Sequence, residues 1–316
     1  MKKKIFLFVV VAFLLIVVGA VLVADLMFGA VRTAPEVSCT TLIKPETRGV
    51  IVFNPPLAQK LIKQRILAMA PKAPEALVDA TLPYQVAVLF DVDYGMSVMN
   101  GTVFLNERRL GPAICQWVNQ QAIPEPYSNV IKEEMVAEKR GVLTRKAVWN
   151  LDRDAMGKLR WEWKNTKLNT PLEPEGGHML EVVLDNRDGG GLVVIATVHG
   201  MLFGTPLDSY MSSSAKDMAT AYSTLRIQAN ITENNELKAK LMIGCSPTAD
   251  TGMIDFIPRY FDMIKNVADE QLAPMGITVT CEPEEVKDGH DFAATYTFSN
   301  ADQLLSAGVL GRFVHL

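Results

Sequence analysis

The stretch YQVAVLFDVDYGMSVMNGTVFLNERR, residues 84–109, decides the fold class of this chain. Two runs rich in β-branched and aromatic residues enclose a short segment that ends in Gly95, a composition typical of two strands and a tight turn. The pattern therefore predicts a β-hairpin whose turn lies at residues 93–95. Residues 225–244, LRIQANITENNELKAKLMIG, predict another hairpin, with its turn at residues 233–235.

Helices are expected around these hairpins. Residues 54–70 begin with an Asn-Pro pair, which is typical of a helix start, and carry one apolar face. Residues 253–272 repeat apolar side chains at helical spacing, with Pro258 at a kink or at the start of the regular helix. Ser299 with Asp302 three residues later predicts the cap of a last short helix.

The remaining elements complete the fold class. Further strands are expected at residues 49–53, 142–149, 159–163, 277–281 and 292–298, and further helices at residues 110–122 and 207–222. The strands at 142–149 and 159–163 are predicted to pair with each other. Hairpins that alternate with helices favour a mostly antiparallel sheet with helices packed on it, the α+β class.

A segment similar to the first hairpin follows ninety-five residues later, and seven of the sixteen residues 88–103 recur at that spacing. The later segment, HMLEVVLDNRDGGGLVVIATVHG at residues 178–200, is predicted to be a hairpin with a glycine-rich turn. The recurrence suggests an internal duplication, with a first α+β subdomain at residues 49–172 and a second at residues 173–316.

The amino terminus predicts a membrane anchor. Residues 5–24 contain no charged side chain, and twenty helical residues span about 30 Å, the thickness of a bilayer core. We expect a cytoplasmic tail at residues 1–4, a transmembrane helix at 5–27 and a stalk at 28–48. Three lysines precede the span, which predicts that the amino terminus lies in the cytoplasm and the bulk outside it, in the periplasm if the cell is Gram-negative. The alternative is a cleaved signal peptide, although no good small-x-small cleavage site follows.

Composition and cysteine spacing limit the function further. A formal net charge of −4 and a pI near 5.7 argue against a nucleic-acid-binding surface. All four cysteines fall on the outer side of the predicted membrane, where disulfides persist, and three pairings are possible: the cysteines are Cys39, Cys115, Cys245 and Cys281. Cys245 and Cys281 each close a predicted strand and could be neighbours at one sheet edge. The absence of a CxxC motif argues against a zinc ribbon or a thioredoxin-type site.

Ser213 and Lys216 have the spacing at which a lysine can activate a serine one helical turn away. The companion motifs of such hydrolases, which should follow in order, are incomplete. Serines also suit the start of the helix expected at residues 207–222. A serine hydrolase that uses Ser213 and Lys216 is therefore the less favoured enzymatic alternative.

Four aspartates lie in or beside the turns of the two similar segments: Asp91, Asp93, Asp185 and Asp188. Paired carboxylates can bind calcium or transfer protons, but a calcium loop needs more oxygen ligands, and aspartate also favours turns for its own backbone hydrogen bonds. Turn formation is the better explanation. Residues 185–192, DNRDGGGL, lack the lysine and the following helix of a phosphate-binding loop.

The other reactive side chains form no recognisable constellation. The histidines are scattered: His178, His199, His290 and His315. Met96 and Met99 have no neighbouring histidine to complete a copper site, so core filling is the better explanation. In residues 159–163, LRWEW, alternation places two tryptophans on one strand face, which we expect to be buried rather than to form a binding patch. No catalytic, cofactor-binding or metal-ligating residue is predicted.

These observations favour a membrane-anchored envelope protein that binds or scaffolds another envelope protein without catalysis. The alternative is a module at the membrane surface that handles an apolar ligand or a lipid.

Overall fold

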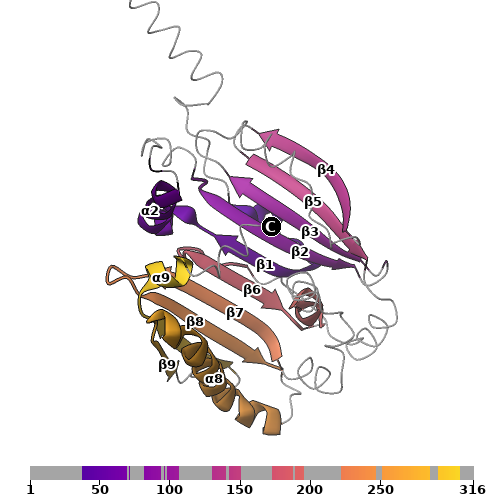
Figure 1. Ribbon diagram of the computed structural model, residues 1–316. Helices are drawn as coiled ribbons and strands as arrows, with labels where there is room; N and C mark the ends of the chain where they lie inside the picture. Colours follow the sequence, from indigo (N-terminus) through magenta and orange to yellow (C-terminus); the bar gives the residue numbers. More distant parts are fainter. Residues whose placement is uncertain are drawn as a thin grey trace, which may run out of the picture.

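The computed structural model describes residues 38–69, 71, 82–93, 96, 98–106, 130–139, 142–150, 173–187, 189–195, 222–246, 251–284 and 291–306. These residues form one ten-stranded sheet in which every pairing of neighbouring strands is antiparallel, together with a few helices (Figure 1). The predicted α+β class is confirmed. The predicted anchor at 5–27 lies outside the described residues, and within them no helix is both long enough and apolar enough to cross a membrane.

The chain forms its elements in the following order. The first half contains η1 (Cys39–Leu42), β1 (Thr47–Phe53), η2 (Pro55–Ala58), α2 (Gln59–Met69), β2 (Gln85–Asp93), β3 (Val98–Asn106), β4 (Val130–Lys139) and β5 (Val142–Asn150). The second half contains β6 (Leu180–Asp185), a helical segment at residues 190–195, β7 (Tyr222–Ile231), β8 (Leu237–Cys245), α8 (Thr251–Leu272), η4 (Ala273–Met275), β9 (Val279–Glu284), β10 (Asp291–Phe298) and α9 (Ala301–Ser306).

The strand order is symmetrical about the centre of the sheet. The order is β4-β5-β3-β2-β1-β6-β7-β8-β10-β9. Counted from the centre of the sheet outward, the strands of each half follow in the order first, second, third, fifth and fourth. The first strands of the two halves, β1 and β6, pair with each other, with Ile51 opposite Val182. We call this β1–β6 pairing the seam.

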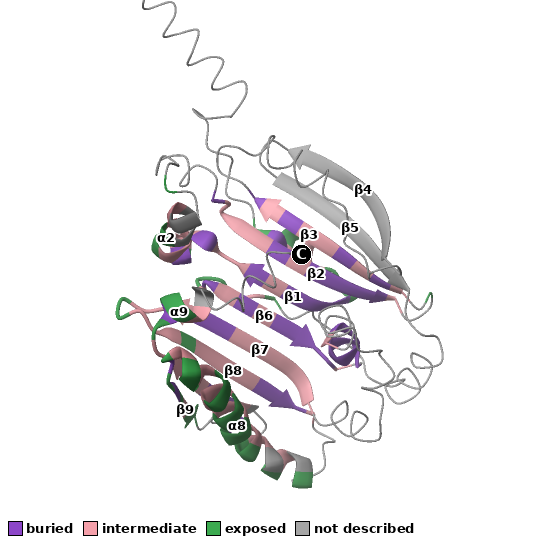
Figure 2. Cartoon of the chain, viewed as in Figure 1, coloured by how far each residue is buried: buried purple, intermediate pink, exposed green. Residues whose placement is uncertain are grey.

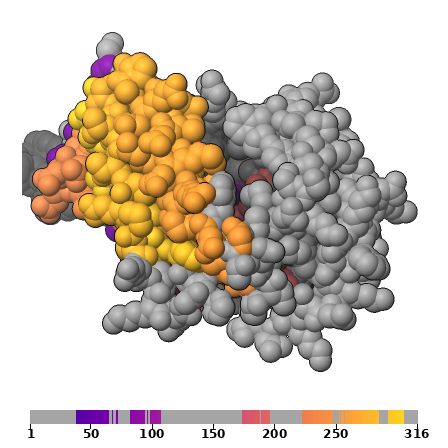
Figure 3. Space-filling view, turned by 90° about the horizontal axis from the view of Figure 1, so that it is seen from below, coloured from indigo at the N-terminus to yellow at the C-terminus, as the bar shows by residue number. Residues whose placement is uncertain are grey.

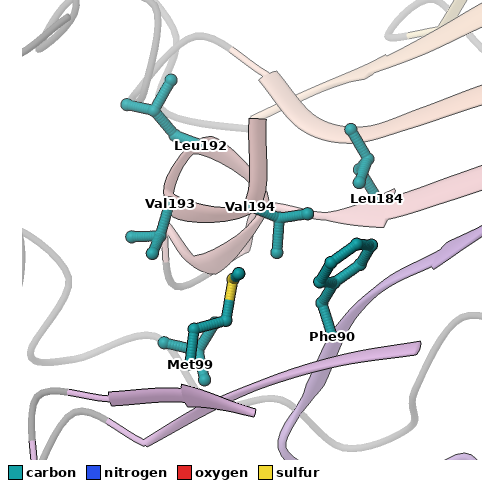
Figure 4. Packing of buried hydrophobic residues seen from close by; sticks show 7 residues of the cluster. Phe90, Met99, Leu184, Leu192, Val193 and Val194 are labelled. Carbon is teal, nitrogen blue, oxygen red and sulfur yellow. The ribbon is translucent and has the colours of Figure 1, made fainter. Parts of the chain in front are cut away.

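The two faces of the sheet are covered differently. Residues opposite each other in register share a face, and alternate residues take opposite faces. The helix face carries Ile51, Val88 and Val182, and it packs against the helical segment 190–195 and, over β8 to β10, against α8. Figure 4 shows Val193 and Val194 of that segment over the strand side chains. The opposite face carries Val50 and Leu89, which are covered by the η1 segment.

The hairpin predicted at residues 178–200 is wrong, because residues 190–195 are helical where its second strand should begin. Strand β6 ends at Asp185, and a turn in which Gly189 N–H donates to the carbonyl of Asn186 leads into a helix. The Asn186 side chain accepts the backbone N–H of Leu192 at 2.9 Å, which stabilises this turn. Residues 192–194 are all buried, whereas a strand would turn alternate side chains to opposite faces. The ninety-five-residue recurrence therefore aligns a strand residue, Val98, with a helical one, Val193, and is not a structural repeat.

Gly49 makes the close approach of this helix possible. A Cβ atom at that position would lie 2.9 Å from Val194 Cγ1 and 3.1 Å from Leu184 Cδ2. Real Cβ atoms essentially never come within 3.0 Å of another heavy atom, so a side chain at this position would force Val194 or the helix that carries it to shift.

Most of the other predicted elements are confirmed, with corrections. The hairpins at 84–109 and 225–244 are β2–β3 and β7–β8, and the helices at 54–70 and 253–272 are η2–α2 and α8, with Pro258 inside α8. Strand β5 pairs with β3 and β4, so its predicted pairing with residues 159–163 is wrong.

Two boundaries also differ from the expectation. The cap of α9 comes from Asn235 in the β7–β8 turn, whose side chain accepts the N–H of Asp302, while the Ser299 hydroxyl accepts the N–H of Thr278 instead. The predicted stalk at 28–48 ends too late, because Cys39 is buried and Thr47 already belongs to β1.

Candidate functional site

A chain of polar groups crosses one end of the seam, and we call it the seam network (Cys39, Asn54, Gln85, His178 and Asn230). Cys39 N–H donates to Gln85 Oε1 at 2.8 Å, and Gln85 Nε2 donates to Asn54 Oδ1 at 3.2 Å. Asn54 Nδ2 then donates to the carbonyl of His178 at 2.6 Å. The first half is thereby tied to the residues that precede β6.

Residues 178–179 are also held by β7, in the second half of the chain. Asn230 of β7 accepts the backbone N–H of Met179 with Oδ1 at 2.9 Å, and its Nδ2 lies 2.8 Å from His178 Nδ1. The backbone N–H of Asn54 donates to the carbonyl of Met179 at 2.8 Å. Residues 178–179 are therefore fastened to both halves at once.

Residues 173–177, which we call the strap, lead to the seam network and are anchored by a buried carboxylate. Glu181 is only 1% exposed, and it accepts the backbone N–H groups of Glu175 at 3.0 Å and Gly176 at 3.1 Å. Gly176 and Gly177 adopt φ values of 79° and 75°, a left-handed conformation that glycine adopts without strain. Successive N–H groups in such a turn form a concavity that suits an anion.

Two side chains of β7 complete the environment of Glu181. Arg226 Nη1 and Gln228 Nε2 each lie 3.3 Å from Glu181 Oε1. The same two side chains also bind the carboxylate of Glu175, so the strap is held by its backbone and by its side chain. The buried charge is therefore paired and fully hydrogen-bonded, as buried carboxylates in stable proteins must be.

The aspartates singled out in the sequence serve local pairing. Asp91 accepts the Thr47 hydroxyl at 2.6 Å and pairs with Lys44 at 3.2 Å. Asp185 pairs with Arg187, with 2.7 Å between Oδ2 and Nη2. Asp93 accepts the N–H of Met96 across the turn, the role expected of it.

The structure gives no metal-ligand cluster in its described part, where no three His, Cys, Asp or Glu side chains are grouped to hold an ion. Met99 is fully buried in the core beneath the helical segment, and Met96 is 68% exposed at the hairpin turn. Met99 therefore fills the core, as expected, and the two methionines do not share a site.

The cysteines described by the structure are all free thiols: Cys39, Cys245 and Cys281. The suggested pairing of Cys245 with Cys281 is wrong, because β10 lies between β8 and β9. Cys281 lies level with Ala239 of β8, six residues from Cys245, which corresponds to roughly 20 Å along the strand, whereas bridged cysteines have Cα atoms within about 7 Å. Burial, the largest influence, raises the pKa of the Cys39 thiol to about 11.

Several predicted candidates lie outside the described residues. They are Ser213, Lys216, Asp188, Cys115, His199, His290, His315 and the tryptophans of residues 159–163.

Comparisons with protein-family models, with curated proteins and with solved structures give no match to this chain.

Sequence reasoning did not single out Glu181, Arg226 or Asn230. Their alternation was a usable signal, because Arg226, Gln228 and Asn230 are two residues apart and share one strand face. The strap, which binds Arg226 and Gln228, lies beside them because β6 pairs with β7. No local sequence pattern predicts that pairing.

Proposed function

We propose that this chain is an envelope protein anchored by one transmembrane helix at residues 5–27, with its amino terminus in the cytoplasm and its bulk outside. In this proposal it acts as a non-catalytic binding or scaffold protein through contacts with another envelope protein. The observation that supports a non-catalytic role is the use made of the buried carboxylates. Asp91 and Glu181 are bound by cationic, hydroxyl or N–H groups of neighbouring elements, which hold the strands and the strap together, and Asp185 pairs with Arg187 in the turn after β6.

The outer side of α8 is the surface that best suits such a contact. Met263 and Val267 are both 48% exposed and lie one helical turn apart, so they form a small apolar pair on this side. Figure 2 shows the exposed residues along α8, and in Figure 3 the orange and yellow C-terminal elements form a continuous surface. Exposed Arg259 and Glu270 flank the pair, and a polar rim of this kind is typical of protein interfaces.

Site-specific photo-crosslinking in intact cells tests the proposal. A photoreactive amino acid at Met263 should give a protein adduct of defined mass, whereas the same probe at exposed Glu282 on the edge strand β9 should not. Adducts from neither position, or from both equally, would count against α8 as the contact surface. An adduct with lipid at Met263 would favour the alternative, a module that handles an apolar ligand or a lipid.

The location is tested separately by the intact mass of the mature protein and by protease treatment of spheroplasts. We expect residues 1–27 to be retained and the body to be digested from outside. A mature protein that starts after residue 24, or a body protected from the protease, would contradict the proposed anchor.

We also propose that the subdomains at 49–172 and 173–316 arose by internal duplication. The support is the identical outward order of their strands from the seam. In a duplication of this kind β6 is the counterpart of β1, and β7 is the counterpart of β2. The two segments that look alike in sequence are not counterparts.

A further inference from the structure

The start of the folded body and the start of the η2–α2 segment lie next to each other. Gln85 joins them, because its Oε1 accepts the N–H of Cys39 at 2.8 Å and its Nε2 donates to Asn54 Oδ1 at 3.2 Å. Asn54 immediately precedes η2, which continues into α2. Residues 28–37, between the proposed anchor and the first described residue, span at most about 35 Å. In the proposed arrangement α2 therefore begins at the end of the body to which the anchor is joined.

The charge of the η2–α2 segment differs from that of the whole chain. Residues 47–74 contain no aspartate or glutamate, whereas the chain has a formal net charge of −4. The α2 sequence, QKLIKQRILAM, contains the cationic residues Lys60, Lys63 and Arg65. A cationic helix in an otherwise acidic protein is typical of a segment that binds an anionic surface.

The η2–α2 segment is only partly packed against the fold. Pro55 and Ala58 of η2 are buried, and η2 lies against β7. Helix α2 chiefly contacts η2, and Figure 1 shows it beyond the end of β1. Leu57 is 50% exposed, and Lys60 and Gln64 are exposed as well. Residues at spacings of three and four share one side of a helix, so an apolar and a cationic side chain face outward together.

We propose that α2 docks on the bilayer that holds the anchor, with Lys60 against anionic phospholipid headgroups and Leu57 at the boundary of the acyl chains. The inference rests on the proposed anchor at residues 5–27. Each lysine or arginine near an anionic membrane surface strengthens binding about fivefold, which is too little to recruit a free protein. The anchor makes the contact intramolecular, so this weak attraction suffices to hold the body in one orientation above the bilayer.

Photo-crosslinking of the full-length protein in lipid vesicles tests the docking. A photoreactive amino acid at Leu57 should give a phospholipid adduct, detected by peptide mass spectrometry, in vesicles of phosphatidylcholine and phosphatidylglycerol. In phosphatidylcholine alone the yield should fall at least about fivefold. Equal yields in the two kinds of vesicle would overturn the proposal.

The matched control position is Met96, which is apolar and 68% exposed. It lies in the turn after β2, whose first residue is Gln85, so it is at the opposite end of that strand from the start of η2. A probe at Met96 should give little lipid adduct in either kind of vesicle. An adduct as abundant as that at Leu57 would overturn the proposal.

Charge variants test whether α2 supplies the attraction. Lys60→Gln should lower the yield at Leu57 by up to about fivefold in the mixed vesicles. Arg259→Gln removes the same charge from the exposed side of α8 and should leave the yield unchanged. Equal losses in the two variants would attribute the attraction to the overall charge of the protein and would overturn the docking of α2. If circular dichroism shows that the probe at Leu57 prevents folding, exposed Gln64 is the second probe position, where the same yields are expected.

Flotation with vesicles of phosphatidylcholine alone separates this inference from the proposed anchor. A protein that does not float with them has no anchor, which contradicts the proposed location. Whether or not the protein floats, a Leu57 probe that gives no lipid adduct in the mixed vesicles overturns the docking of α2. An adduct with a second copy of the chain would show that α2 is an interface between copies, and it would also overturn the proposal.

Discussion

Gly49 occupies the point where β1 passes beneath the helical segment 190–195, and the cost of a side chain there can be measured. Gly49→Ala should lower the free energy of unfolding by about 1–3 kcal/mol, because its Cβ would overlap Val194. Urea denaturation checks the value. Combining Gly49→Ala with Val194→Ala should recover part of the loss, since the second change removes the nearest atom. Strictly additive losses would show that the overlap is not the cause.

The buried and exposed carboxylates that bind Arg226 should contribute very differently to stability. Glu181→Gln removes a buried charge and sets an amide donor near the strap N–H groups, so it should cost about 3 kcal/mol of unfolding free energy. Glu175→Gln is the matched control, because Glu175 is 62% exposed, and it should cost less than about 1 kcal/mol. Equal losses in the two variants would contradict the role given to Glu181.

At the scale of single residues, the sequence predicted local roles and missed distant ones. The turn role of Asp93 depends on a residue three positions away, and it is confirmed. The role of Glu181 depends on its hydrogen bonds with β7 and with the strap. The residues around Glu181 in the sequence do not predict those partners.

Among the elements, α9 depends on a turn from another hairpin. Asn235 has a φ of 61° and its side chain bonds with Asp302 at both the N–H and the carboxylate. Asn235→Gly keeps the backbone conformation but loses the cap, so it should cost about 1 kcal/mol, and Asn234→Gly in the same turn should cost less. Thermal unfolding checks both.

The same cap should depend on pH. The hydrogen bond from Asn235, the largest influence, lowers the pKa of Asp302 below its usual value. A lowered pKa stabilises the fold above the unfolded value, so this contribution is present above about pH 4 and is lost as the pH falls through the folded pKa. The stability difference between the native protein and Asn235→Gly should therefore shrink below about pH 4. A difference that stays constant down to pH 2.5 would show that the carboxylate takes no part.

The exposed edge of β9 is protected against pairing with another chain. It carries Pro283, flanked by Glu282 and Glu284, and proline and charge both discourage strand addition. Changing Glu282 and Pro283 to valine together should produce larger species in sedimentation velocity. Pro274→Val, at an exposed proline of η4, is the control and should sediment like the native protein. Unchanged sedimentation of the double variant would mean that the edge is protected by other means.

The elements also show which patterns can be predicted. The hairpins β2–β3 and β7–β8 are encoded by alternation and a local turn, and both are confirmed. Residues 192–195 have high strand propensity, but burial against β2, β3 and β6 overrides it and gives a helix. That outcome depends on Gly49, more than a hundred residues earlier, so local propensity could not supply it.

For the whole molecule, the core beneath the helical segment joins the two halves. It contains Phe90 and Met99 from the first half and Leu184, Val193 and Val194 from the second, as Figure 4 shows. We expect the halves to unfold together in one cooperative transition.

Buried thiols in the two halves can test this expectation. Cys39 and Cys245 are 1% and 5% exposed, and each should react with an alkylating reagent only after its own half unfolds. Peptide mass spectrometry across a urea series should give the same midpoint for both thiols. The half-buried Cys281 should react earlier and serves as the control. Separate midpoints for Cys39 and Cys245 would show that the halves unfold independently.

The position of the seam has a consequence for how the protein is made. Asn54 and His178, which meet there, are 124 residues apart in the chain. Synthesis proceeds from the amino terminus, so one edge of β1 stays unpaired until β6 has left the ribosome. During that interval the apolar GVIVF sequence of β1 is an edge that is prone to aggregation. A nascent chain that is stalled between β1 and β6 should therefore aggregate more readily than the complete protein.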